Sequence, residues 1–167
     1  MADWADFLAQ DRGVHSEGKA SAVLFRLGPE WLALSVQRFK EVTPIRVIHR
    51  LPHQKNGTLL GLVNIRGEIH LCASLKDVLG IGDVEEPSHR AVSRMVLVGK
   101  ERDQWVVPVD EIYGIHRYNQ SELRKVPVTV AKAAVKFTCG MLSWEGKSVG
   151  LLDDELLFYA LRRSSLS

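Results

Sequence analysis

A seven-residue frame with glycine at both ends occurs twice in the chain, and this repeat constrains the fold more than any other feature. The first copy is residues 61–67 (GLVNIRG). The second copy, residues 140–146 (GMLSWEG), follows roughly 79 residues later, a period far longer than that of solenoid repeats. Glycine allows tight turns and close approach of backbones. Each copy therefore predicts a strand, a tight turn and a second strand.

The similarity continues beyond the two glycine frames. Each copy runs through an apolar strand into a short amphipathic helix, at residues 74–79 and at residues 153–157. Ser74 and Asp153 occupy the same place in the frame, and both residue types are good helix N-caps. A weaker echo relates the apolar stretches LALSV and WVVPV earlier in each half. The sequence predicts two similar β-rich halves, each starting with a hairpin and ending with a capped helix.

These motifs resemble the CheW-like domain of bacterial chemosensory coupling proteins. The asparagine–apolar–Arg–Gly turn at residues 64–67 is the most specific element of the resemblance. Further matching stretches, in the same order along the chain, are residues 24–28, 36–42, 107–112 and 150–153. The resemblance implies a mainly β fold of two small five-stranded SH3-like β-barrels packed side by side, with short capping helices. Many short strands with closely spaced turns favour small barrels independently.

The predicted organisation is an N-terminal extension at residues 1–20 and a CheW-like domain at residues 21–163. Within the domain we expect a first barrel half at about 21–82 and a second at about 88–163, which includes the closing helix. In the extension, Trp4, Phe7 and Leu8 have the spacing of one helical face. That face could be a docking helix, a frayed tail or a helix folded back on the barrel.

By resemblance, the protein would be a non-enzymatic adaptor in a cytoplasmic signalling array. It would join the cytoplasmic tip of a methyl-accepting chemoreceptor to the regulatory domain of a CheA-type histidine kinase. The positions that match the family's contact residues are Val36, Glu41, Gly61, Asn64 and Arg66. An arginine held at a hairpin tip beside apolar residues suits docking on a carboxylate-bearing partner. Gly61 and Val36 would equally serve folding alone.

The chain departs from the family pattern after the Arg–Gly turn. Leu71 and Ser74 stand where the family usually has a proline and an aspartate. We therefore expect a coupling protein of an accessory or specialised chemosensory system. Two alternatives remain open: an array-filling protein that binds receptors or its own kind without kinase, and a small-ligand-binding barrel.

Other site chemistries find little support in the sequence. No Gly-x-Ser-x-Gly elbow and no phosphate-binding loop occurs, and Pro52 interrupts the only close histidine pair, His49 and His53. We expect no enzymatic activity, no cofactor and no metal. A net charge of +2 without a basic tract argues against nucleic acid, and no apolar run is long enough to span a bilayer. Cys72 and Cys139 are expected to be buried thiols, with a disulfide as the alternative.

Overall fold

The structure, a computed structural model, describes residues 19–52, 57–82, 93–127 and 132–165. The helical face expected at Trp4, Phe7 and Leu8, His53, and the link expected between the two halves lie outside these residues.

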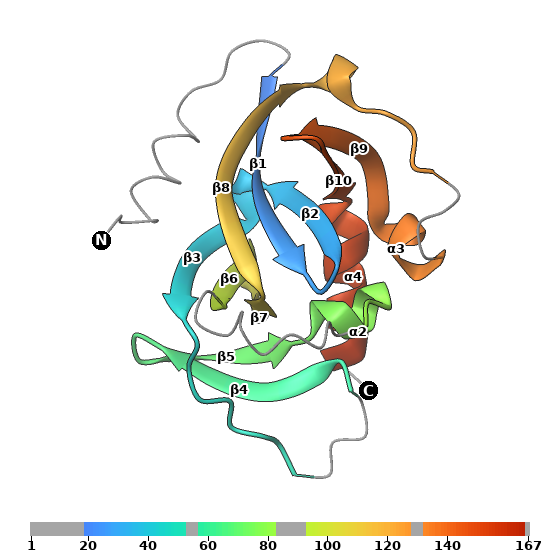
Figure 1. The fold of residues 1–167 in the computed structure, drawn as a ribbon. Coiled ribbons are helices and arrows are strands. Elements are labelled where there is room, and N and C mark those ends of the chain that lie inside the picture. Colours follow the sequence, from blue (N-terminus) through green and yellow to red (C-terminus); the bar gives the residue numbers. More distant parts are fainter. Residues whose placement is uncertain (1–18, 53–56, 83–92, 128–131, 166–167) are drawn as a thin grey trace.

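Within the described residues, ten strands form two five-stranded sheets, which confirms a mainly β fold (Figure 1). Sheet A has the order β8-β1-β2-β10-β9 and contains β1 (Lys19–Leu27), β2 (Glu30–Ser35), β8 (Glu111–Asn119), β9 (Thr138–Trp144) and β10 (Lys147–Leu152). Sheet B has the order β3-β6-β7-β5-β4 and contains β3 (Phe39–Pro44), β4 (Leu59–Ile65), β5 (Glu68–Ala73), β6 (Arg94–Lys100) and β7 (Asp103–Val109). Neighbouring strands are antiparallel except for β2 with β10 and β5 with β7.

Short helices occur in both halves of the chain, and one follows the second strand of each glycine-frame hairpin. They are η1 (Val36–Arg38), α2 (Leu75–Leu79), η3 (Gln120–Glu122), α3 (Lys132–Phe137) and α4 (Asp154–Ser165). The predicted N-caps are confirmed: the Ser74 hydroxyl accepts the Asp77 N–H at 3.2 Å, and the Asp153 carboxylate accepts the Leu156 N–H at 3.2 Å. Ser74 thus caps α2 although the family usually has an aspartate there.

The two glycine frames form the β4–β5 and β9–β10 hairpins, as the repeat predicts. In the first turn Arg66 and Gly67 have φ of 52° and 86°; in the second, Glu145 and Gly146 have φ of 47° and 76°. Two consecutive positive φ values are the pattern of a type I′ turn, which matches the twist of paired strands. The internal repeat is therefore a repeat of backbone conformation.

The expected division into one barrel from residues 21–82 and another from 88–163 is wrong. Sheet A takes β1 and β2 from the first half but β8, β9 and β10 from the second, and sheet B takes the reverse set. The physical reason lies in two very short connections. Only η1 separates β2 from β3, and only Asp110 separates β7 from β8, so the chain passes directly from one sheet to the other. Each half of the sequence contributes to both sheets.

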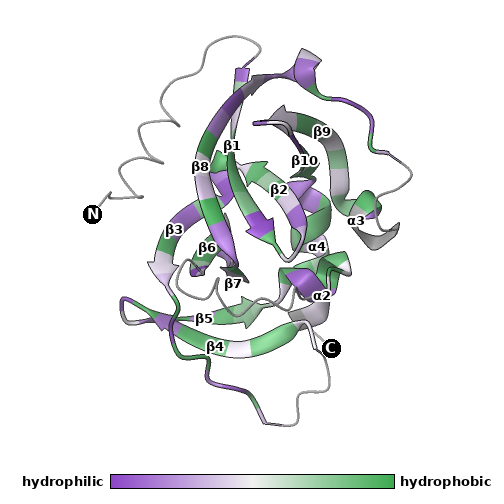
Figure 2. Cartoon of the chain, in the orientation of Figure 1, coloured by the Kyte–Doolittle hydropathy of each residue, from purple (hydrophilic) through white to green (hydrophobic). Residues whose placement is uncertain are grey.

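The hydrophobic core has three parts because the central strands are buried on both faces. In β1, Val23, Phe25 and Leu27 belong to a cluster shared by the two sheets, whereas Ala22 and Leu24 belong to a cluster within sheet A. A third cluster lies within sheet B, and α4 packs apolar side chains onto the shared cluster. Figure 2 shows apolar residues recurring along the strands of both sheets. The shared cluster holds the sheets together.

Isolated bridges connect the two edges of each sheet. His49, in the chain that leaves β3, exchanges two backbone hydrogen bonds of 2.8 Å with Leu62 of β4. Arg124, beyond β8, does the same with Met141 of β9 at 2.9 Å. Each sheet therefore curls until the extension of one edge strand reaches the other edge. This curvature brings the β4–β5 turn close to β3.

Candidate protein-interaction site

Arg66, the predicted contact residue, lies at the exposed tip of the β4–β5 hairpin. Its Nε lies 2.9 Å from Oε1 of Glu41, which comes from β3 at the opposite edge of sheet B. The Arg66 side chain is 74% exposed and that of Glu41 18%. No other partner of the Arg66 guanidinium occurs among the described residues. An ion pair this exposed contributes at most about 1 kcal/mol to stability.

Asn64 orders the turn that presents Arg66. Its Oδ1 accepts the Gly67 N–H at 2.8 Å, while the residue itself is exposed. An asparagine that bonds to the backbone a few residues onward is a common way to stabilise a tight turn. The structure thus brings Asn64, Arg66 and Glu41 together at one end of sheet B.

Gly61 and Val36 do not join this surface. Gly61 has φ of +147°, and an added Cβ would lie 2.4 Å from the His49 carbonyl oxygen. Only glycine permits the His49–Leu62 bridge at that distance. Val36 is 5% exposed and belongs to the core cluster shared by the sheets. The expected place of Val36 on a contact surface is therefore wrong, because η1 carries its side chain inward where the chain crosses between sheets.

Sequence reasoning missed a row of exposed apolar residues beside Arg66. Ile69 is 59% exposed and pairs with Asn64 across the hairpin. Val47 is 72% exposed and lies two residues before His49, which forms the bridge to Leu62 of β4. We call Val47, Asn64 and Ile69 the sheet B row. Val47 lies in a loop and Ile69 in β5, so no local pattern in the sequence indicates that the two side chains lie close together.

The corresponding end of sheet A is built differently. Trp31, Tyr113 and Trp144 pack against one another with ring centroids 4.4, 5.6 and 5.4 Å apart, and the Lys147 ammonium lies 3.6 Å from the Trp31 ring centroid. We call these three rings the aromatic cluster. The Tyr113 hydroxyl donates to Glu111 at 2.5 Å, and burial raises its pKa to about 12. This end of the molecule is covered by its own side chains.

The remaining described residues supply no chemical centre. Within the described part of the chain, no group of three His, Cys, Asp or Glu side chains could hold a metal ion. No helix there is long and apolar enough to cross a membrane. Both cysteines are free, so the alternative of a disulfide is wrong. Cys72 is buried, which raises its pKa to about 12, but Cys139 is exposed, against expectation, because it faces outward from edge strand β9.

Comparison with solved structures finds the same fold in a scaffolding protein, TtCheW from Thermoanaerobacter tengcongensis. The two chains are 23% identical with a TM-score of 0.70, and the match covers 86% of this chain and 90% of the other. No curated protein matches the sequence. The family model of the CheW-like domain matches residues 21–162, nearly the whole of both sheets and α4. The chain therefore belongs to the CheW-like domain family, whose members are non-enzymatic scaffolding proteins of chemotaxis signalling.

Proposed function

We propose that the protein is an adaptor that couples methyl-accepting chemoreceptors to a CheA-type histidine kinase in a cytoplasmic chemosensory array. The observation that carries the proposal is the exposed Arg66–Glu41 pair next to the sheet B row. Family membership supports a scaffold, and this end of sheet B supplies a surface on which a scaffold can bind a partner. The departures at Leu71 and Ser74 favour an accessory system over the principal one.

The composition of this surface suits a protein interface. Interfaces have an apolar centre and a polar rim, and arginine is common among the residues that contribute most to binding. Here Val47 and Ile69 would form the apolar centre and Arg66 the rim. Its guanidinium keeps donors beyond Nε that could reach a partner carboxylate. Arg66 would thus contribute orientation and specificity. The sheet B row would contribute most of the buried area.

An adaptor of this kind needs no chemistry of its own. It holds receptor and kinase in one assembly, and a receptor signal changes kinase activity only if the contacts differ between the kinase's states. A rigid surface on strands transmits such differences better than a loop would. The Gly61 approach and the Asn64 bond keep the Arg66 turn in one conformation.

The test is co-purification of Arg66→Glu with the cognate CheA-type kinase, with and without a receptor-tip fragment. We expect the variant to keep its fold, because the ion pair it loses is exposed, and to lose at least tenfold in affinity for one partner. Glu145→Arg, at the corresponding turn of sheet A, is the matched control and should bind both partners normally. The double variant Glu41→Arg with Arg66→Glu restores the internal ion pair but not the contact, so it should remain defective.

Three outcomes would change the assignment. Normal binding of both partners by Arg66→Glu would show that the contact lies elsewhere. Binding of wild-type protein to receptor but never to kinase would favour the array-filling alternative. If wild-type protein bound neither partner, the small-ligand-binding alternative would become the better hypothesis.

A further inference from the structure

Exposed arginines and exposed apolar side chains occur together in residues 45–50, the segment that leaves β3. Ile45 is 51% exposed and Val47 72%, and Arg46 and Arg50 are exposed as well. Figure 2 shows hydrophobic and hydrophilic residues mixed along this segment, which runs on from the end of β3. Apolar side chains that stay exposed next to cations are typical of a surface that binds another segment of protein.

The segment lies against the β4–β5 hairpin. Two contacts fix its position: the ion pair between Glu41 and Arg66 precedes it, and the bridge between His49 and Leu62 lies within it. It therefore shares one end of sheet B with the Arg66 turn. We call the following residues the basic face: Ile45, Arg46, Val47, Arg50 and Arg66.

Positive charge exceeds negative charge at the basic face. Neither Arg46 nor Arg50 forms an ion pair with a described residue. Strands β3, β4, β5 and β6, which surround the face, contain two carboxylates, Glu41 and Glu68, and the first of these already pairs with Arg66. The two remaining arginines are available to carboxylates from outside the described residues.

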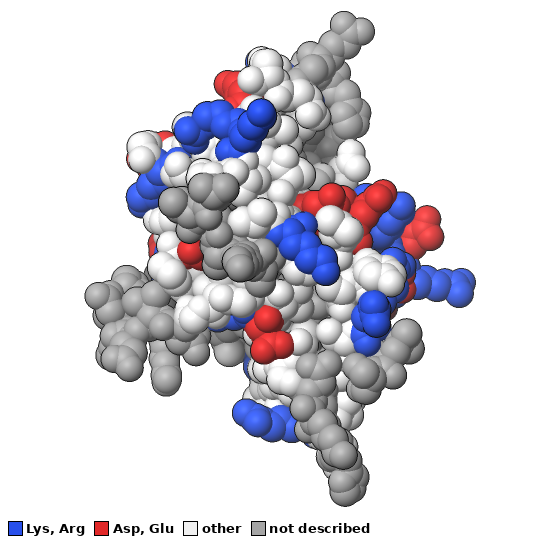
Figure 3. Space-filling view, turned by 90° about the vertical axis from the view of Figure 1, so that its right-hand side faces the viewer, with Lys and Arg blue, Asp and Glu red and all other residues white. Residues whose placement is uncertain are grey.

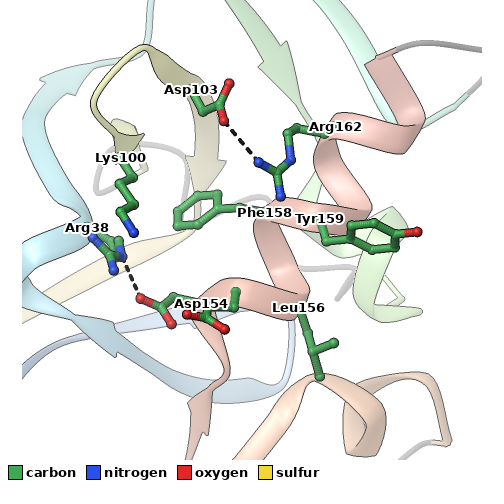
Figure 4. A pocket seen from close by; sticks show the side chains of 9 residues that line it. Arg38, Lys100, Asp103, Asp154, Leu156, Phe158, Tyr159 and Arg162 are labelled. Carbon is green, nitrogen blue, oxygen red and sulfur yellow. Dashed lines mark hydrogen bonds and ion pairs between the residues drawn. The ribbon is translucent and has the colours of Figure 1, made fainter.

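A second exposed apolar surface, on α4, lacks this excess of positive charge. Leu156 is 40% exposed and Tyr159 53%, and both line a pocket in which Figure 4 shows two internal ion pairs. Cations and carboxylates are equal in number there: Arg38, Lys100 and Arg162 with Asp103, Asp154 and Glu155. Figure 3 shows charges of both signs intermingled on this side of the molecule. An acidic segment is therefore attracted to the basic face and not to α4.

Such an acidic segment is present in the chain itself. Residues 1–18 lie outside the described part of the structure, and their sequence contains four carboxylates and one arginine. Trp4, Phe7 and Leu8 have the spacing of one helical face, and Asp11, seven residues after Trp4, belongs to that same face. Asp6 belongs to the other side of the same helix. A helix here would present three apolar groups and a carboxylate together, which complements the basic face.

The extension is long enough to reach the basic face of its own molecule. Ten residues, 9–18, connect Leu8 to the start of β1. Fully extended they span about 35 Å, more than twice the radius of gyration of about 15 Å expected for a domain of this size. In Figure 1 β1 begins at the top and the β4–β5 turn lies at the lower left, a separation that such a tether can cover. A tether also gives an effective concentration in the millimolar range, so weak contacts suffice.

We propose that residues 1–18 dock on the basic face of the same molecule and cover the Arg66 turn. The apolar side chains of the extension pack on Ile45 and Val47, and Asp11 pairs with an arginine of the face. The consequence for signalling rests on the proposed function: the docked extension competes with the partner assigned to this surface and lowers its apparent affinity.

The first test compares NMR spectra of the ¹⁵N-labelled full chain with and without the apolar groups of the extension. In the double variant Trp4→Ala with Phe7→Ala, we expect amide signals of residues 45–50 and of the Arg66 turn to shift, while signals of sheet A stay in place. Asp11→Lys should shift the same signals. Asp6→Lys makes the same change of charge on the other side of the helix, and is the matched control that should leave them unchanged.

The second test supplies the extension as a separate peptide. A capped peptide of residues 2–12 is titrated into the double variant, and we expect it to shift the signals of residues 45–50 back towards their wild-type positions. Adding Arg46→Glu and Arg50→Glu to the double variant should weaken peptide binding at least tenfold. Arg102→Glu, at an exposed arginine of the β6–β7 turn, is the control and should not weaken it.

Three results would overturn the proposal. The first is that the double variant leaves the signals of residues 45–50 unchanged. The second is that Asp6→Lys acts as strongly as Asp11→Lys, since total charge and not a helical face would then govern the effect. The third is that the wild-type signals of residues 45–50 move to the positions of the double variant on tenfold dilution, because the extension would then bind a second copy of the chain.

These results need neither kinase nor receptor, so they are independent of the proposed function. With a partner present, the double variant should bind at least threefold more tightly than the wild type. If the NMR spectra show docking and partner affinity is unchanged, the regulatory consequence is wrong and the partner surface assigned to Arg66 fails, whereas docking of the extension stands.

Discussion

The β4–β5 and β9–β10 turns have the same backbone and opposite surfaces. Arg66–Gly67 and Glu145–Gly146 both have two consecutive positive φ values. The first turn presents a largely exposed arginine beside the sheet B row, whereas the second lies next to the aromatic cluster. The two turns therefore share their backbone conformation, whereas the side chains that surround them differ.

The difference originates one residue before each turn. Ile65 is 2% exposed and packs inside sheet B, so its side chain covers nothing outside. Trp144, at the corresponding place in sheet A, is only half-buried and contacts Trp31 and Tyr113. A larger side chain thus closes the end of sheet A internally. The end of sheet B keeps its apolar residues exposed, which is why we assign the partner surface to it.

The largest effect on stability is expected at β3 and β8, the strands that begin where the chain passes from one sheet to the other. Phe39 begins β3 and pairs with Val98; Ile112 lies at the corresponding place in β8 and pairs with Phe25. Phe39 is 1% exposed, so Phe39→Ala should lower the free energy of unfolding by about 3–5 kcal/mol. Ile112 is only partly buried, and Ile112→Ala should cost about 1–2 kcal/mol. Urea denaturation measures both, and equal costs would show that the crossings are equivalent after all.

A smaller effect is expected at the first glycine of each frame. Gly61→Ala places Cβ 2.4 Å from the His49 carbonyl oxygen at φ of +147°, and should destabilise by about 1–3 kcal/mol. At Gly140 the nearest atom would be Cδ2 of Leu123 at 3.0 Å, the end of a side chain that can move. Gly140→Ala should therefore cost less than Gly61→Ala. The measurement is the midpoint of thermal unfolding of the two variants. A lower midpoint for Gly140→Ala than for Gly61→Ala would contradict the close approach of Gly61 to the His49 carbonyl oxygen.

The smallest effect is the contribution of Tyr113, in sheet A, to the pH dependence of stability. Burial, reinforced by the hydrogen bond to Glu111, raises the pKa of Tyr113 from 10.0 to about 12. The folded state therefore holds this proton more tightly than the unfolded state. Its contribution to stability is complete below about pH 10 and is lost as the pH rises towards 12.

Tyr113→Phe should remove that part of the alkaline loss of stability. The measurement is the urea midpoint of wild type and variant across this pH range. The other groups that titrate there, Cys72 among them, are common to both proteins and cancel in the difference. Parallel curves for the two proteins would show that Tyr113 does not contribute.

Local features of the site were predictable because they depend on near neighbours. The turn at Arg66, the cap at Ser74 and the cap at Asp153 each involve hydrogen bonds or dihedral angles within a few residues, and all three have the predicted form. The pairing of Arg66 with Glu41 was less accessible, since it joins two edges of a curled sheet. The family resemblance named both residues but not their contact.

The sequence by itself determined the elements: two copies of a hairpin frame, their caps, and an alternation that buries the central strands. Only the tertiary structure decided how those elements were shared between sheets. Alternation specifies that a residue is buried, not which of two apolar surfaces buries it. Val36 therefore entered the shared core, and β1–β2 and β6–β7 each joined the sheet of the other half. The sheet B row has the same origin. It is assembled from segments far apart in the chain, and no local pattern encodes their proximity.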